Sequence, residues 1–231
     1  MSSISTQSKG TILWDIDGTI ISPVRKSIKS PHISTILKYG IEPNLSAETL
    51  IGSTDFEVLE NLLNNFKDEN KSNLLVDCFK VLDEESLEIY NYESFDLCLG
   101  MPDVLIEVRK RGWTNGILTG NTYNRMEMKL SQIIDLFDPS LIFECKLGDT
   151  RENIARRASE LFTSKGISNI VIVGDTPRDI SIAKEFGFQV VSVATGKFTI
   201  DALEKFKPHL LLKNFKHDAK NFFNFIDAFN N

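Results

Sequence analysis

The sequence predicts an α/β protein built on a doubly wound parallel sheet, and two observations support this fold class. Short, continuous apolar runs recur along the chain, which is typical of parallel strands that are buried on both faces. Segments with helical spacing of apolar residues separate these runs, as in sheets with helices on both sides. The expected strands are residues 11–14, 114–118, 141–143, 170–173, 190–193 and 210–212.

Four helices are expected between these strands, and a fifth is expected near the carboxyl end of the chain. The first has proline in its opening turn and stops at Gly112, an arrangement that helices favour. In the last, Phe222, Phe225, Ile226 and Phe229 keep helical spacing. The four between strands are expected at residues 102–111, 123–134, 151–162 and 177–186.

Residues 21–97 interrupt the alternation, because they contain no convincing strand and three helical segments. Ser30 and Pro31 open the first segment, which Gly40 ends. Thr54 and Glu57 form a capping-box pattern at the start of the second, and Leu74–Leu82 gives the third. We therefore predict a core of residues 1–20 and 98–231 with a helical insert at 21–97, above the carboxyl ends of the strands.

Charge and cysteine content narrow the class of protein. The formal net charge is −6 and the pI is near 5.2, whereas dedicated nucleic-acid binders usually carry a basic excess. The sequence contains no run of 18 apolar residues, so we expect no membrane span. Residues 1–10 lack the apolar stretch of a secretory signal. Three cysteines without C-x-x-C spacing predict neither a disulfide framework nor a zinc site. We expect a reducing, cytoplasmic setting, with no nucleic-acid or membrane partner.

The most specific chemical signal is Asp15-Ile16-Asp17-Gly18-Thr19, directly after the first predicted strand. Asp15 is suited to attack an electrophile, and Asp17 to pass a proton to the leaving group. Gly18 permits a sharp turn, and Thr19 can bond to the local backbone. An Asp-rich surface turn is the simpler interpretation of these five residues taken alone.

A second acidic motif follows the predicted strand at 170–173 and contains Asp175 and Asp179. An ordinary helix cap is the competing interpretation. If both motifs meet at one sheet edge, each pair of like charges about 4 Å apart costs on the order of 4 kcal/mol at an effective dielectric of about 20. A hard cation removes that cost, and an all-oxygen site with a phosphate ligand suits Mg²⁺.

Two weaker signals complete the set. Thr119, Gly120 and Asn121 follow the predicted strand at 114–118, where a hydroxyl and backbone N–H groups can hold phosphate oxygens. A cation is also needed to balance the transferring group. The candidates between the third and fourth strands are Lys146, Arg151, Arg156 and Arg157, each of which alone is typical of a solvated helix face.

In this order and spacing, the motifs resemble those of the haloacid dehalogenase superfamily, whose core is Rossmann-like and whose phosphoglycolate-phosphatase-like members carry a helical cap after the first motif. The resemblance covers nearly the whole chain. It implies that Asp15 forms an aspartyl-phosphate and that Asp17 is the general acid and base. It also implies a Mg²⁺ site made by Asp15, the backbone carbonyl of Asp17, Asp175 and, as ligand or neighbour, Asp179.

The third motif departs from the family pattern, because the usual Lys-Pro pair is missing. One group of family members has the motifs T-G-N, K-L and G-D in this order, followed by an Arg. The corresponding residues of this sequence are Thr119–Asn121, Lys129-Leu130, Gly148-Asp149 and Arg151. The resemblance therefore assigns the phosphate-stabilising cation to Arg151, with Lys146 as the alternative. In the insert, Gly52–Asp55 resembles a substrate-facing loop, so Thr54 is either a substrate contact or only the helix cap.

The resemblance predicts a Mg²⁺-dependent phosphatase that acts on a small phosphorylated metabolite. Three alternatives stay open. A phosphotransferase or phosphomutase of the same fold would pass the phosphoryl group to a sugar, and a non-catalytic relative would only bind phosphate. A signalling receiver domain also has an Asp pair on an α/β sheet, but such domains are shorter and lack the insert. The sequence leaves the substrate and the oligomeric state open.

Overall fold

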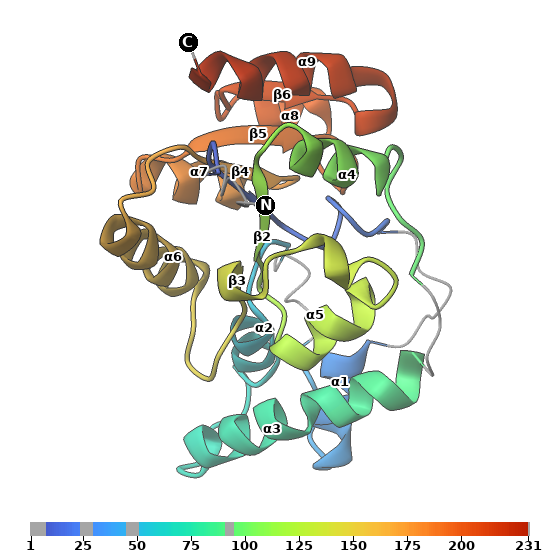
Figure 1. The fold of residues 1–231 in the computed structure, drawn as a ribbon. Coiled ribbons are helices and arrows are strands. Elements are labelled where there is room, and N and C mark those ends of the chain that lie inside the picture. Colours follow the sequence, from blue (N-terminus) through green and yellow to red (C-terminus); the bar gives the residue numbers. More distant parts are fainter. Residues whose placement is uncertain (1–7, 24–29, 45–50, 91–94, 231) are drawn as a thin grey trace.

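The computed structural model describes residues 8–23, 30–44, 51–90 and 95–230, and it contains one six-stranded sheet (Figure 1). Every strand pairs in parallel with its neighbours, in the order β3-β2-β1-β4-β5-β6. This is the doubly wound order that reverses direction beside β1. The strands are β1 (Thr11–Trp14), β2 (Thr114–Leu118), β3 (Ile142–Phe143), β4 (Ile170–Gly174), β5 (Gln189–Val193) and β6 (Leu210–Leu212). The predicted fold class is confirmed.

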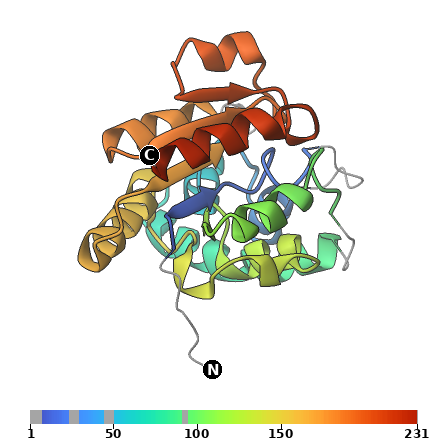
Figure 2. The same ribbon diagram turned by 45° about the horizontal axis from the view of Figure 1, so that its top comes forward.

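Helices cover both faces of the sheet, which explains why the strands are continuously apolar. On one face, α4 (Asp103–Lys110) and α9 (Phe215–Asp227) pack over a cluster that contains Trp14, Phe215 and Phe222 (Figure 2). On the other face, α6 (Arg151–Lys165) and α7 (Pro177–Glu185) bury a cluster around Leu13 and Phe162. A short helix, α8 (Ile200–Glu204), which the sequence pattern did not reveal, precedes β6.

One predicted helix is shorter than expected. The spacing of apolar residues predicts a helix at 123–134, but α5 spans Tyr123–Leu130 and is followed by a 3₁₀ turn at Ile134–Leu136. Ile133 donates its N–H to the Leu130 carbonyl at 2.8 Å, which turns the chain. This turn brings Ile133 and Phe137 into the core below α4, and that burial outweighs the continuation of the helix.

Three helices from the segment between β1 and β2 pack on one another around a separate apolar cluster. They are α1 (Pro31–Lys38), α2 (Asp55–Leu62) and α3 (Lys71–Tyr90). The cluster between them contains Ile36, Leu59, Cys78 and Leu82. In Figure 1 this group lies at the end of the molecule opposite β6 and α9. We refer to it below as the helical insert. Parts of the predicted insert, residues 24–29, 45–50 and 91–94, lie outside the described residues.

None of the helices in the described part of the chain has both the length and the apolar character that crossing a membrane requires. The cysteines Cys78, Cys98 and Cys145 are buried free thiols.

Candidate active site at the carboxyl edge of the sheet

The loop after β1 is a tight turn that places Asp15 at the sheet edge beside β4. The Asp15 N–H donates to the Val173 carbonyl at 2.9 Å, which continues the pairing of the two strands. Gly18 then takes a φ of +89°, and a Cβ there would lie 2.4 Å from Asp175 Oδ2. The turn therefore requires glycine both for its backbone conformation and for the close approach of Asp175.

Three carboxylates converge at this edge, as the two acidic motifs predict. Each of Asp15, Asp175 and Asp179 offers an oxygen within 4.8 Å of the others, and all three residues are buried. The Asp17 carboxylate is not part of this cluster, and the family resemblance implies a metal contact only for its backbone carbonyl. A cluster of buried oxygens with excess negative charge is the donor set that a hard cation such as Mg²⁺ prefers, so these residues fit the predicted metal.

Burial and the excess negative charge raise the pKa values of two of these carboxyl groups. Burial raises the pKa of Asp15 from 3.8 to about 8; Arg151 opposes this effect, while Asp179 and Asp17 add to it. Burial and then Asp15 raise the pKa of Asp175 well above its ordinary value. One guanidinium therefore does not compensate for the buried carboxylates, and a bound cation would.

Arg151 is the cation that the fold brings to Asp15. It opens α6, where the Thr150 side chain caps the helix, and the Arg151 side chain is 2% exposed. Its Nη2 lies 3.2 Å from Asp15 Oδ1 and also bonds to Asp179, whereas Nε is buried without a hydrogen-bond partner among the described residues. The alternative, Lys146, is 62% exposed and lies 3.6 Å from Glu144.

A second polar group forms around Asp17 and lies at the ends of β1 and β2. Asn121 Nδ2 donates to Asp17 Oδ2 at 2.9 Å and to Thr119 Oγ1 at 2.8 Å. Lys129, on α5, places Nζ 2.5 Å from the same Asp17 oxygen and 2.6 Å from Asn121 Oδ1. The side chains of Thr119 and Asn121, which we predicted to meet phosphate, are thus part of a network that holds Asp17.

The K-L motif of the family resemblance contains Lys129, but no functional role was predicted for this residue. It lies on the buried face of α5 with Met126 and Leu130, although lysine is seldom fully buried unless it is paired. A lysine in line with the apolar positions of a helix was the signal available in the sequence.

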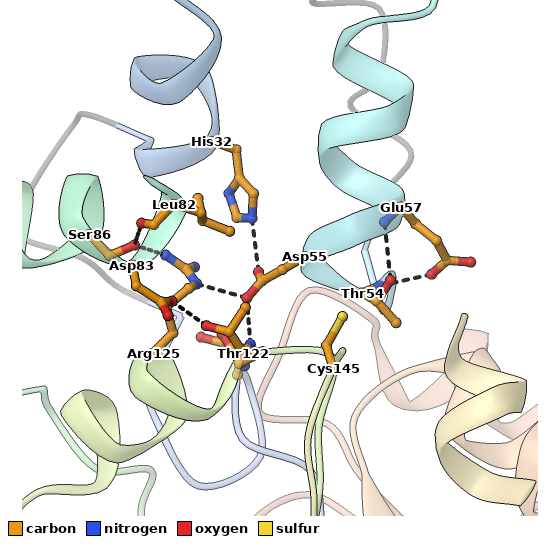
Figure 3. Close-up of polar contacts among 12 residues, drawn as sticks. His32, Thr54, Asp55, Glu57, Leu82, Asp83, Ser86, Thr122, Arg125 and Cys145 are labelled. Carbon is orange, nitrogen blue, oxygen red and sulfur yellow. Dashed lines mark hydrogen bonds and ion pairs between the residues drawn. The ribbon is translucent and has the colours of Figure 1, made fainter. Parts of the chain in front are cut away.

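Asp55 joins the helical insert to the core (Figure 3). Its carboxylate accepts hydrogen bonds from the Thr122 N–H, Arg125 Nε and His32 Nε2, each at 2.8 Å. Burial by itself would raise the pKa of Asp55, but Arg125 and His32 outweigh it and hold the pKa well below its usual range. Burial lowers the pKa of His32, which favours the neutral ring. Asp55 therefore stays ionised as a fully compensated buried carboxylate.

Thr54 precedes Asp55 and acts as the N-cap of α2. Its hydroxyl accepts from the Glu57 N–H at 3.1 Å, and Glu57 Oε2 accepts from the Thr54 N–H at 2.8 Å (Figure 3). The same hydroxyl donates to the Asp149 carbonyl of the core at 2.7 Å. The residue is fully buried. Of the two interpretations of Thr54, the structure favours the helix cap, because the hydroxyl is already used as both donor and acceptor.

Gly120 explains how closely the insert approaches the core. A Cβ at this position would lie 2.6 Å from the Ser53 carbonyl oxygen, and the Gly120 carbonyl accepts from the Asp55 N–H at 2.7 Å. Gly120 was predicted as a phosphate contact, but its visible role is to let the insert loop rest on the loop after β2.

A cavity of about 410 Å³ lies between the sheet edge and the insert. Asp15, Asp17 and Asp175 line its base, and His32, Asp55 and Val58 line the insert side. The loop after β5 also lines the cavity, although no sequence motif predicted a role for it. There Thr195 Oγ1 donates to the Gly18 carbonyl at 2.5 Å, a Cβ on Gly196 would collide with Asp175, and the exposed Lys197 lines the cavity.

A doubly wound parallel sheet with clustered acidic residues at the ends of β1 and β4 defines a class of α/β enzymes that bind their ligands at the strand-order reversal. The family model of haloacid dehalogenase-like hydrolases matches residues 12–193. The chain belongs to this family, and the resemblance seen in its motifs is confirmed. No curated protein matches the chain.

Solved structures share the fold at low sequence identity. A predicted phosphatase from Clostridium acetobutylicum has a TM-score of 0.70 at 16% identity, covering 93% of this chain and 98% of that one. A predicted phosphoglycolate phosphatase from Haemophilus somnus gives 0.68 at 18%, covering 95% and 99%. CbbY from Rhodobacter sphaeroides, solved in complex with phosphate, gives 0.69 at 15%, covering 90% and 96%.

Proposed function

We propose that the protein is a Mg²⁺-dependent phosphatase that hydrolyses a small phosphomonoester through an aspartyl-phosphate on Asp15. One observation carries this proposal. Asp15 lies in a buried carboxylate cluster with Asp175 and Asp179, and Arg151 Nη2 approaches it to 3.2 Å. A carboxylate nucleophile beside a fixed cation suits attack on an electron-poor phosphorus, because the cation offsets the negative charge of the reacting group.

Asp15, the backbone carbonyl of Asp17, Asp175 and Asp179 would hold Mg²⁺, as the family resemblance implies. When bound, the ion would neutralise the carboxylates and polarise the phosphoryl oxygens. The raised pKa of Asp15 supports a cation requirement, since without a cation this carboxyl group favours the protonated form at neutral pH, which is not nucleophilic. The pKa of Asp175 is raised in the same direction by burial and by Asp15.

In the first step, an Asp15 carboxylate oxygen forms a bond to phosphorus as the bond between phosphorus and the leaving oxygen breaks. Asp17 gives its proton to that oxygen. In the second step, Asp17 takes a proton from water, and the water oxygen attacks phosphorus. The Asp15–phosphorus bond breaks, which releases phosphate and restores the carboxylate.

Arg151 would offset charge on the phosphoryl oxygens, and the loops at Gly18-Thr19 and Thr119–Asn121 would supply backbone N–H groups to them.

The insert at residues 21–97 would act as the cap that selects the leaving group and excludes water. The low-identity phosphatase structures support this assignment through the fold. The three buried free thiols support a reducing, cytoplasmic setting.

The test is phosphate release from p-nitrophenyl phosphate and from a panel of phosphorylated metabolites, with Mg²⁺ and with EDTA. The matched variants are Asp15→Asn and Asp77→Asn, the latter on an exposed part of α3. We expect activity that requires both Mg²⁺ and Asp15 and is unaffected at Asp77. Substantial activity in Asp15→Asn would refute the mechanism. Transfer of phosphate to a sugar without its release would favour the phosphomutase alternative, and binding without turnover would favour a non-catalytic relative.

A further inference from the structure

Lys129 is one of the most deeply buried charged groups near the cavity, with its side chain 1% exposed. Burying an ammonium is unfavourable unless charge and hydrogen bonds compensate for the lost water. Here the compensation comes from two groups at the site, Asp17 Oδ2 at 2.5 Å and Asn121 Oδ1 at 2.6 Å. A buried lysine directed at a catalytic carboxylate needs an explanation beyond packing.

The contacts of Asp17 show what this lysine does. Asn121 Nδ2 reaches the same Oδ2 atom at 2.9 Å, so two donors from different elements converge on one oxygen. The Asp17 side chain is 42% exposed. Because much of this side chain faces solvent, we attribute its orientation to these two hydrogen bonds, one from an ammonium and one from an amide.

Two of the basic residues that line the cavity are divided between the two aspartates of the first motif. Arg151 lies at Asp15, whereas Lys129 lies at Asp17. Arg125, one helical turn before Lys129 on α5, bonds to Asp55 at 2.8 Å and ties this helix to the insert (Figure 3). Lys129 therefore extends from a helix that is anchored on both the core and the insert.

We propose that Lys129 is a positioning residue that holds the Asp17 carboxyl group in the orientation needed for proton transfer to the leaving oxygen. This inference rests on the proposed phosphatase function. Proton transfer by Asp17 matters most for poor leaving groups, because a good leaving group departs without a proton. Loss of Lys129 should therefore affect substrates unequally, whereas a damaged fold or a lost phosphate contact would affect all of them alike.

The experiment compares kcat/KM on phenyl phosphate and on p-nitrophenyl phosphate for wild type, Lys129→Met and the control Glu127→Gln, which lies on the exposed face of α5. We expect Lys129→Met to lose about 10²-fold on phenyl phosphate and less than about fivefold on p-nitrophenyl phosphate. Glu127→Gln should match wild type on both. Equal losses on the two esters in Lys129→Met would overturn the proposal.

A double-mutant cycle asks whether Lys129 acts through Asp17. In an Asp17→Asn background, adding Lys129→Met should cause no further selective loss on phenyl phosphate, since the proton donor is already missing. An additional loss of the full size would contradict the proposal. If Lys129→Met does not fold, Lys129→Gln, which keeps an N–H donor, should retain an intermediate activity on phenyl phosphate.

A crystal structure of Lys129→Met separates this inference from the proposed function, because it needs no turnover. A reoriented Asp17 carboxyl group would support the positioning role, and an unchanged orientation would refute it. Activity that survives in Asp15→Asn would instead overturn the phosphatase mechanism, whatever the state of Asp17.

Discussion

The active-site edge and the contact between insert and core each bury an aspartate, but their surroundings are opposite. Asp55 meets one backbone N–H, one guanidinium and one imidazole, and its pKa falls. Asp15 meets one guanidinium and the like charges of Asp179 and Asp17, and its pKa rises to about 8. Burial is similar at the two positions, so the neighbouring charges decide the difference.

The difference distinguishes a structural carboxylate, Asp55, from the proposed nucleophile, Asp15. At Asp55 both carboxylate oxygens accept hydrogen bonds from neighbouring donors, so this ion pair joins the insert to the core. At Asp15 the neighbouring groups leave negative charge uncompensated, and the proposed cation would offset it. Stability and metal-binding measurements on variants of the two aspartates test this contrast.

The largest effect on stability is expected at Asp55. Asp55→Asn removes the charge that compensates the buried Arg125, and breaking such a pair costs about 3–5 kcal/mol of unfolding free energy. Asp15→Asn in the metal-free protein should cost much less, because it relieves like-charge repulsion. Urea denaturation with EDTA measures both, and Asp77→Asn serves as the exposed control. A larger loss in Asp15→Asn than in Asp55→Asn would contradict the contrast.

Magnesium should stabilise the fold only through the active-site edge. At a free Mg²⁺ concentration of 100 times its dissociation constant, the expected gain in unfolding free energy is about 2.7 kcal/mol. Asp175→Asn should abolish most of this gain, because it removes one carboxylate of the cluster. Asp55→Asn, although less stable, should keep the full gain. Thermal unfolding with and without Mg²⁺ provides the measurement, and an equal loss of the gain in both variants would disprove this assignment.

The pH dependence should differ in sign between the two aspartates. Since the pKa of Asp15 is raised from 3.8 to about 8, the metal-free folded state holds a proton that the unfolded state releases. Asp15 therefore lowers stability as pH rises from about 4 to 8, by at most about 1.4 kcal/mol per pH unit. Asp55 has a lowered pKa, so its contribution is present above its ordinary value of 3.8 and is lost only in acid below it.

The measurement is unfolding free energy in EDTA between pH 5 and 8 for wild type and Asp15→Asn. The difference between their slopes reports Asp15 together with the effect of its charge on the pKa of Asp175, whereas His32 titrates in both proteins. The slope of wild type should be the more negative of the two. Identical slopes would show that Asp15 titrates normally.

The smallest effect is expected at the cap of α2. Thr54→Ala removes a hydroxyl that caps the helix and bonds to the Asp149 carbonyl, and such caps contribute about 1 kcal/mol. We expect unfolding free energy to fall by this amount, with kcat on p-nitrophenyl phosphate little changed. A drop in activity of more than about tenfold, equivalent to 1.4 kcal/mol, would restore Thr54 as a substrate contact.

The sheet could be predicted from the sequence, because continuous apolar runs at strand length and the helical segments between them permit few other arrangements. The meeting of the acidic motifs at Asp15 and Asp175 could be predicted in the same way, since the carboxyl ends of parallel strands must share one edge. The early end of α5 was not predictable, because local periodicity favours helix to residue 134 and only burial of Ile133 and Phe137 turns the chain.

Tertiary structure alone decided which cation serves which carboxylate. Four basic residues between β3 and β4 were candidates, and the start of α6 directs Arg151 to Asp15 while leaving Lys146 exposed. Lys129 and Asp17 are far apart in sequence, as are Asp55 and Arg125, so local patterns carry no record of either pair. Their meeting depends on how the insert and α5 pack above the sheet. Charge compensation is a property of three-dimensional distance, which the order of residues does not specify.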